Sequence, residues 1–211
     1  SHALWKLPAQ EPHEVDFFGE LMAVSEGNIV RVYDRHTGMV RTYTHPWFGH
    51  IHTVSFSPDG TRLLVASTGF DTFIEFDVAT GDATWEWNAW EHGHDQSLDG
   101  HYATRSPARA EELRAAGETV VVVEDPAAWQ GYGLPTKQRP AALNGARYLD
   151  ANRILITLFH LGMALVVDRA KNGKPIARRR AHNKRAIGAP VPATVTRIGK
   201  TNNGNASKIR W

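Results

Sequence analysis

The chain has 211 residues, of which 42% are hydrophobic and 22% charged, a composition ordinary for a globular domain with a substantial core. It contains no cysteine, which excludes disulfides and thiolate metal sites. No run of about 18 apolar residues is present, so we expect no membrane-spanning helix and no membrane partner. The absence of cysteine is compatible with cytoplasm or periplasm, and we take the cytoplasm as the working expectation.

The net charge of +2 conceals an asymmetry along the chain. Residues 1–150 hold 11 Lys/Arg and 21 Asp/Glu, whereas residues 151–211 hold 13 Lys/Arg and one acid, Asp168. A basic final part attracts phosphates or acidic surfaces. The alternative, which we prefer, is that it docks on the acidic remainder of the same molecule.

Three segments share one pattern, an alternating strand closed by an aspartate and a glycine-containing turn, which is typical of a hairpin. They are NIVRVYDRHTG, TFIEFDVATG and MALVVDRAKNG, with aspartates Asp34, Asp77 and Asp168. The first two aspartates lie 43 residues apart and the last two lie 91 apart, about two periods. VVVVEDPAAWQG, with Asp125, supplies a unit between them. A period of about 43 with several short strands per unit predicts a β-propeller rather than a helical solenoid.

We therefore predict an all-β chain that forms a single β-propeller domain over residues 1–211. Its five blades are expected at 9–46, 47–90, 91–137, 138–180, and 181–211 completed by an N-terminal strand at 3–8. This pairing of the terminal segments leaves no strand edge exposed. The alternative is that the chain is part of a larger propeller.

One segment, SPARAEELRAAGE at 106–118, has helical composition within the third expected blade. Pro107 near its start and Gly117 after it are typical helix boundaries. We predict a short helical insertion here. Insertions on propellers lie on one face, which is often the binding face.

The unit at 49–81 resembles the WD40 and YVTN-type β-propeller repeats. GH, VSFSPDGTRLLVAS, an Asp and FIEFD follow one another in WD-repeat order, and Phe76 stands where the repeat has its Trp. The resemblance implies that His50 hydrogen-bonds Asp71 and that Ser67 belongs to the same structural set. His52 is not a repeat position, and it begins the innermost strand, which lines the central channel of a propeller.

The fourth unit, ALNGARYLDANRILITLFH, also resembles a blade of the arylsulfate sulfotransferase-type propellers, which carry H-x-N before such a strand. Asn144 matches this motif, but Ala142 stands in place of its histidine. The departure falls on a functional residue, which argues against sulfuryl transfer through a histidine nucleophile.

A second group of candidate residues lies in WEHGHDQSLDGHY. His92, His94 and Asp95 are the candidate ligands if a divalent metal binds, although their spacing matches no strong metal motif, and we expect no other cofactor. Trp90 precedes this group, and Asn144 begins an inner strand like His52. The expected ligand-binding residues are His52, Trp90, His92, His94 and Asn144.

The segment RAKNGKPIARRRAHNKR is strongly basic. Its central cations are Arg178, Arg179, Arg180, Lys184 and Arg185. Such a cluster binds nucleic-acid phosphates in a salt-dependent way, but the segment lacks aromatic residues for base stacking. The alternative is a solvated basic loop.

Two functions follow from these patterns. The first is a WD40-like binding or interaction module that takes a protein or small-molecule ligand on its His- and Trp-rich face. The alternative is a propeller enzyme in which His52, His94 and His160 perform acid–base or metal-assisted transfer or hydrolysis. Propellers host both functions, and an enzyme requires these side chains to converge on one point.

Overall fold

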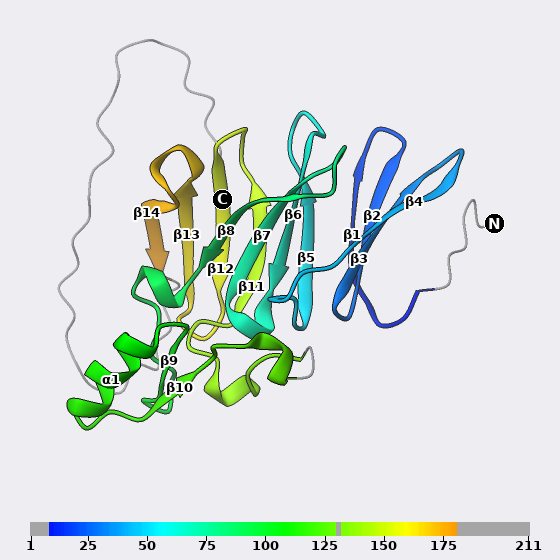
Figure 1. Ribbon diagram of the computed structural model, residues 1–211. Coiled ribbons are helices and arrows are strands. Elements are labelled where there is room, and N and C mark those ends of the chain that lie inside the picture. The colour runs from blue at the N-terminus through cyan, green and yellow to red at the C-terminus, as the bar shows by residue number, and fades with distance from the viewer. Residues whose placement is uncertain (1–8, 130–131, 181–211) are drawn as a thin grey trace, which may run out of the picture. The chain divides into compact units, whose positions relative to one another are not determined.

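The computed structural model describes residues 9–129 and 132–180. The chain divides into two units, residues 1–181 and 182–211, and the described residues belong to the first. Within them the chain forms three four-stranded antiparallel sheets, one two-stranded parallel sheet and one α-helix (Figure 1). The prediction of an all-β chain with one short helix is therefore confirmed.

Each four-stranded sheet is a meander, because strands adjacent in sequence are adjacent in the sheet. The first sheet contains β1 (Pro12–Phe18), β2 (Leu21–Glu26), β3 (Ile29–Asp34) and β4 (Gly38–Tyr43). The second sheet contains β5 (Ile51–Phe56), β6 (Arg62–Ser67), β7 (Thr72–Asp77) and β8 (Ala83–Asn88). The third sheet contains β11 (Leu143–Tyr148), β12 (Arg153–Leu158), β13 (Met163–Asp168) and β14 (Lys174–Arg180). This up-and-down arrangement is that of propeller blades.

The third strand of each sheet ends at an aspartate that closes the following turn. Each carboxylate accepts one or two backbone N–H groups of that turn, at 2.8 to 3.0 Å. A glycine with positive φ then starts or precedes the fourth strand, so the backbone takes a conformation that other residues rarely adopt. The predicted Asp–Gly hairpins are confirmed at Asp34, Asp77 and Asp168.

The second sheet lies between the other two. Side chains alternate along β6, so Leu63 and Val65 pack in the core shared with the first sheet, whereas Leu64 packs in the core shared with the third. The third sheet supplies Ile154, Ile156 and other apolar residues to that second core. Three blades therefore follow one another without a fourth between them.

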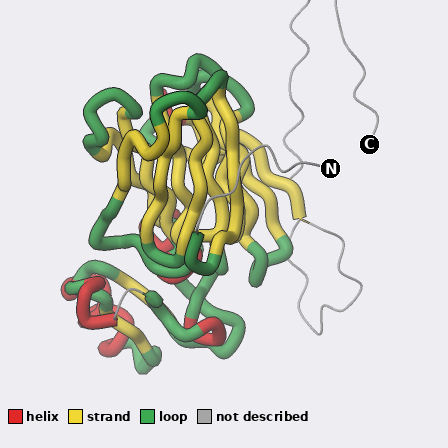
Figure 2. Tube along the Cα trace, turned by 90° about the vertical axis from the view of Figure 1, so that its right-hand side faces the viewer, coloured by secondary structure: helices red, strands yellow, loops and turns green. Residues whose placement is uncertain are grey.

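The residues expected to form a blade at 91–137 do not do so. They belong to the long connection, residues 89–142, which contains β9 (Tyr102–Thr104), α1 (Pro107–Ala115) and β10 (Val120–Val122). These elements lie beyond one end of the strands of the sheets (Figure 1, Figure 2). Because the chain from β9 to β10 passes through α1, the two strands pair in parallel, which a blade built of hairpins does not allow. The spacing of 91 residues between Asp77 and Asp168 reflects this connection and no additional blade.

The connection also explains Asp125, which the repeat pattern placed in a hairpin. It follows β10 and accepts the N–H of Ala127 at 2.9 Å in an ordinary turn.

Helix α1 has the predicted boundaries, with the Ser106 side chain accepting the N–H of Arg109 at its start and Gly117 just beyond its end. Short 3₁₀ turns complete the described structure at Thr68–Phe70, Trp90–His92, Pro126–Trp129, Thr136–Gln138 and Arg169–Lys171. The expected fifth blade, 181–211 with 3–8, lies outside the described residues.

Candidate functional site

The same backbone feature begins the first strand of each sheet. The residues just before β1, β5 and β11 have positive φ: Glu11 at 48°, His50 at 55° and Ala142 at 47°. Each of these strands then shows a register shift against the second strand of its sheet. Such bulges re-aim side chains at strand ends. The residues two positions after the positive φ are His13, His52 and Asn144.

Strand β5 contacts both β1 and β11, so these three strand starts are neighbours. The His50 Nδ1 and His52 Nε2 atoms lie 3.0 Å apart, which makes one imidazole the donor and the other the acceptor of a hydrogen bond. The His13 ring lies 5.5 Å from the His50 ring and 5.3 Å from the His52 ring, between centroids. We call His13, His50, His52 and the nearby Arg139 the histidine cluster.

The histidine cluster has a positive electrostatic environment. Burial, followed by the charges of His50, His13 and Arg139, lowers the pKa of His52 to about 4. Burial and the same kind of neighbours lower the pKa of His50, with Glu11 acting weakly in the opposite direction. Both imidazoles are therefore neutral at pH 7.

His50 does not pair with Asp71, so this implication of the repeat resemblance is wrong. The fully buried Asp71 carboxylate accepts the indole N–H of Trp90 at 3.0 Å and the backbone N–H groups of Ala141 and Leu143 at 2.9 Å each. Burial raises the pKa of Asp71, and these three bonds oppose the rise. In the repeat the histidine is the hydrogen-bond partner of this aspartate. Here the connection supplies the partners instead, because it returns over the turn that carries Asp71.

Ser67, which was expected to be structural, and Trp90, which was expected to bind a ligand, both hold parts of the fold together. The Ser67 hydroxyl accepts the N–H of Gly49 at 2.8 Å and donates to the carbonyl of Trp47 at 2.7 Å. Trp90, expected to bind a ligand, is 5% exposed and holds Asp71 through its indole. Its side chain therefore holds the connection against the second sheet.

The connection reaches the second sheet through a very close backbone approach. The Leu134 N–H donates to the Gly69 carbonyl at 2.8 Å, and a Cβ on Gly133 would lie 2.4 Å from Gly69 atoms. Only glycine fits there, and its φ of 75° also suits glycine. This approach fixes the segment that carries Arg139, whose Nε donates to the Leu134 carbonyl at 2.6 Å.

The catalytic candidates do not converge. The ring neighbours of His52 are His13 and His50, whereas His160 Nδ1 lies 2.8 Å from the Arg139 carbonyl oxygen. His94 lies in a separate pocket. In the described part of the chain, no hydrogen bond or ring contact joins His52 to His94 or His160.

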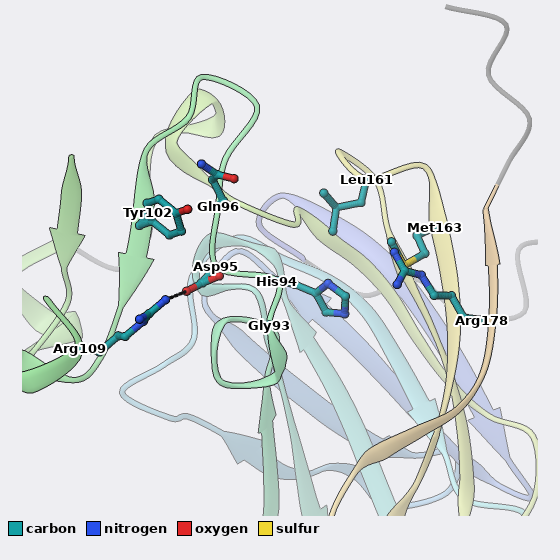
Figure 3. Close-up of a pocket in the computed structure, with 9 residues that line it drawn as sticks. All are labelled: Gly93, His94, Asp95, Gln96, Tyr102, Arg109, Leu161, Met163 and Arg178. Atoms are coloured by element: carbon teal, nitrogen blue, oxygen red, sulfur yellow. Dashed lines mark ion pairs between the residues drawn. The ribbon is translucent and has the colours of Figure 1, made fainter. Parts of the chain in front are cut away.

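That pocket, of about 410 Å³, lies between the connection and the third sheet. Figure 3 shows His94 in the middle, with the ion pair of Asp95 and Arg109 on one side and Met163 and Arg178 on the other. The Asp95 and Arg109 atoms of this pair are 3.6 Å apart. Burial lowers the pKa of His94, and Arg178 acts in the same direction.

The candidate metal ligands His92 and Asp95 have separate partners. The His92 ring stacks on Trp87 at 4.8 Å between centroids, while Asp95 pairs with Arg109. Within residues 9–129 and 132–180, no group of three His, Asp or Glu side chains has the arrangement that a metal ion needs. Sequence proximity therefore did not bring these three residues to one point.

Of the expected basic patch, three residues lie on β14. Arg178 and Arg179 are exposed. Because successive residues of a strand point to opposite faces of the sheet, these two side chains lie on different faces, and their partners on β13 are Leu165 and Ala164 respectively. Arg178 lines the pocket. Lys184 and Arg185 lie outside the described residues.

The sequence patterns missed two members of the histidine cluster. His13 has a signal, because HEVDF at 13–17 and HTVSF at 52–56 share histidine, valine and phenylalanine at the same spacing. Arg139 has no such signal, since it reaches the cluster only through the docking of the connection.

They also missed the fully buried Glu75, which joins the second and third sheets. Its carboxylate accepts the Tyr148 hydroxyl at 2.7 Å and the Arg169 Nε at 3.0 and 3.1 Å, and Arg62 lies 3.5 Å away. Burial and the Glu75 charge raise the pKa of Tyr148. The alternating pattern of β7 gave no sign that a carboxylate points into this core.

Two solved structures are similar to the chain. The chain is similar to the Neurospora crassa Pan2 WD40 domain, with 13% identity, a TM-score of 0.46, and 81% of this chain and 36% of that chain covered. It is also similar to Kuenenia stuttgartiensis hydrazine synthase, with 11% identity, a TM-score of 0.50, and coverage of 85% and 38%. At these identities the likeness concerns the fold alone.

No family model and no curated protein sequence matches the chain. The chain spans little more than a third of the length of either structural neighbour. Among its described residues, no helix has the length and hydrophobicity needed to cross a bilayer. The sheet topology and the similarity to hydrazine synthase together show an all-β fold of the β-propeller type.

Proposed function

We propose that this chain is a WD40-like β-propeller binding module that holds an anionic group of a small-molecule ligand at the histidine cluster. The observation that carries the proposal is the contact of three imidazoles from two neighbouring sheets beside one guanidinium. Two of these imidazoles, His13 and His52, occupy corresponding positions on β1 and β5. The third, His50, has the positive φ that directs its ring toward His52.

The sign of the local charge decides what kind of ligand fits. Burial is the largest cause of the lowered pKa of His52, and His50, His13 and Arg139 act in the same direction, so the cluster disfavours a metal cation. Two carboxylates offset part of this positive charge, because Glu11 acts in the opposite direction on His50 and the Asp71 charge acts on Arg139. A carboxylate or phosphate therefore suits the cluster better than a divalent metal.

The hydrogen-bonding capacity of the cluster supports the same ligand. The bond between His50 and His52 uses the Nδ1 atom of His50 and the Nε2 atom of His52, so the Nδ1 atom of His52 is not used in this bond. Arg139 contributes a guanidinium, the side chain that matches carboxylate and phosphate geometry best. Asn144, at the corresponding position on β11, would supply an amide.

The alternative, a propeller enzyme that uses His52 with His94 and His160, is less well supported. It requires these three side chains to meet, whereas their contacts place them at different points of the fold. A binding module needs only one of these sites, and it does not need the three histidines to meet.

The test is phosphate binding measured by isothermal titration calorimetry on the full chain at mildly acidic pH. We expect His52→Gln to weaken binding about tenfold, the effect of losing one hydrogen bond to a charged group. The matched control is His36→Gln, because His36 is exposed on the turn between β3 and β4, and it should bind as the parent does. Equal binding by both variants, or none by the parent, contradicts the proposal.

A further inference from the structure

The side chain of His160 contacts the segment of the connection that carries Arg139. Its Nδ1 atom lies 2.8 Å from the Arg139 carbonyl oxygen, and because a carbonyl only accepts hydrogen bonds, the imidazole is the donor. We propose that His160 is a positioning residue, which holds the Arg139 guanidinium at the histidine cluster and thereby sets the anion affinity of that site. This role of His160 rests on the function proposed above and differs from acid–base chemistry.

The segment that carries Arg139 is attached to the second sheet at both ends. Before Arg139, the Leu134 N–H donates to the Gly69 carbonyl at 2.8 Å. After it, the Ala141 N–H donates to the Asp71 carboxylate at 2.9 Å. Gly69 and Asp71 belong to one turn between β6 and β7, so the chain leaves this turn and returns to it. Arg139 therefore lies on a short excursion whose two ends are fixed.

His160 joins this excursion to the third sheet, because it lies in the turn between β12 and β13. Its backbone N–H donates to the Ala141 carbonyl at 3.1 Å, in addition to the bond from its imidazole to Arg139. The backbone bond remains when the side chain is replaced, so the third sheet keeps its hold on the segment. The side-chain bond fixes the peptide group that joins Arg139 to Pro140. A ring without a donor in place of the imidazole therefore releases this peptide group and leaves the backbone attachments in place.

The orientation of that peptide group determines where the Arg139 side chain lies, because both are bonded to the same Cα atom. Arg139 is buried, and its Nε donates to the Leu134 carbonyl at 2.6 Å. Burial lowers the pKa of Arg139 and the Asp71 charge opposes this, and an arginine keeps its charge in proteins. After burial, the Arg139 charge is the largest cause of the lowered pKa of His50. A guanidinium that turns away from the imidazoles loses this effect and its contact with a bound anion.

The first readout is the pKa of His52, measured by NMR titration of the full chain without phosphate. Burial lowers this pKa to about 4, and His50, His13 and Arg139 act in the same direction. His160→Phe keeps a ring but lacks the donor, so Arg139 should turn away and the pKa of His52 should rise. His160→Asn, whose side-chain N–H₂ is also a donor on the δ atom, should restore the parent value. A purely structural role of His160 would change stability without this shift.

A double-mutant cycle tests whether His160 acts through Arg139. In calorimetric titrations with phosphate at mildly acidic pH, His160→Phe should weaken binding about tenfold. Added to Arg139→Gln, the same change should cause no further loss. His36→Phe, the same substitution at an exposed position, should bind phosphate as the parent does.

Three results would overturn the positioning role of His160. They are an unchanged pKa of His52 in His160→Phe, equal behaviour of His160→Phe and His160→Asn, and a full tenfold loss from His160→Phe in the Arg139→Gln background. A parent chain that binds no phosphate contradicts the proposed function instead, and the pKa of His52 in the same variants then decides whether His160 positions Arg139.

Discussion

Asp71 and His52 are polar residues at the same end of the second sheet, but their surroundings differ. Asp71 is completely buried, and three donors fixed by the fold satisfy its carboxylate. His52 is half-buried, its ring contacts are two other imidazoles, and its Nδ1 atom is not used in the bond to His50. A buried group whose bonds are all internal belongs to the scaffold, whereas a group with bonding capacity left is available to a ligand.

Glu75 belongs with Asp71 in this comparison. It is fully buried, and its partners come from both the second and the third sheet. Burying a carboxylate costs free energy unless it is paired. The hydrogen bonds and ion pairs of Glu75 supply this pairing, and they fix how the two sheets pack. The scaffold carboxylates should therefore govern stability, and the histidine cluster should govern binding and pH response.

The largest effect is expected from Asp71→Ala. This change leaves the indole N–H of Trp90 and two backbone N–H groups buried without an acceptor, and it should lower the free energy of unfolding by about 3–5 kcal/mol. Urea unfolding measures the loss. Asp71→Asn keeps one acceptor oxygen and tolerates the positive φ, so it should cost less. A loss for the alanine variant within about 0.5 kcal/mol, typical of surface substitutions, would place Asp71 outside the scaffold.

A smaller effect is expected from Glu75→Gln. The variant leaves Arg62 and Arg169 without their counter-charge at a buried position, and we expect a loss of about 2–3 kcal/mol in the same urea experiment. Both arginines reach solvent in part, which keeps the loss below that of a fully buried pair. Tyr148→Phe removes one hydrogen bond to the same carboxylate and should cost about 1 kcal/mol. Equal losses for the two variants would show that the charge of Glu75 does not matter.

The sequence predicted what depends on local pattern. Alternation and turn chemistry located the strands, and Asp34, Asp77 and Asp168 close their hairpins as expected. Local pattern did not distinguish a blade from a crossover, because the apolar run TVVVV can form a strand of either one. The strand in this run follows a helix, and it pairs in parallel with the strand before that helix.

The candidate site was predicted only in part for a similar reason. His52 was identified from its strand, but its partners depend on the positive φ of His50 and on contacts between sheets. The partners of Asp71 come from two parts of the connection, Trp90 at 19 residues along the chain and Ala141 at 70. Contacts over such separations have no signature in a single sequence.

A further effect is expected on the pH dependence of stability. The pKa of His52 is about 4 in the folded chain, below its ordinary value of 6.5, so the unfolded chain binds more protons between these values. The contribution of His52 is therefore complete above about pH 6.5 and is lost as the pH falls towards 4. His13, His50, Arg139 and Glu11 surround this ring and remain in the variant.

His52→Gln should consequently lose less stability than the parent between pH 6.5 and pH 4, as measured by urea unfolding at several pH values. His36→Gln, which removes an exposed histidine, serves as the control and should follow the parent. An unchanged pH dependence in the His52 variant would mean that its imidazole is not held neutral by the histidine cluster.

The most direct test of the central claim is an NMR titration of the imidazoles of His50 and His52 against pH, with and without inorganic phosphate. An anion bound at the histidine cluster stabilises the protonated imidazoles, so phosphate should raise the pKa of His52 from about 4. A His52 pKa that stays the same at saturating phosphate would contradict anion binding at the histidine cluster.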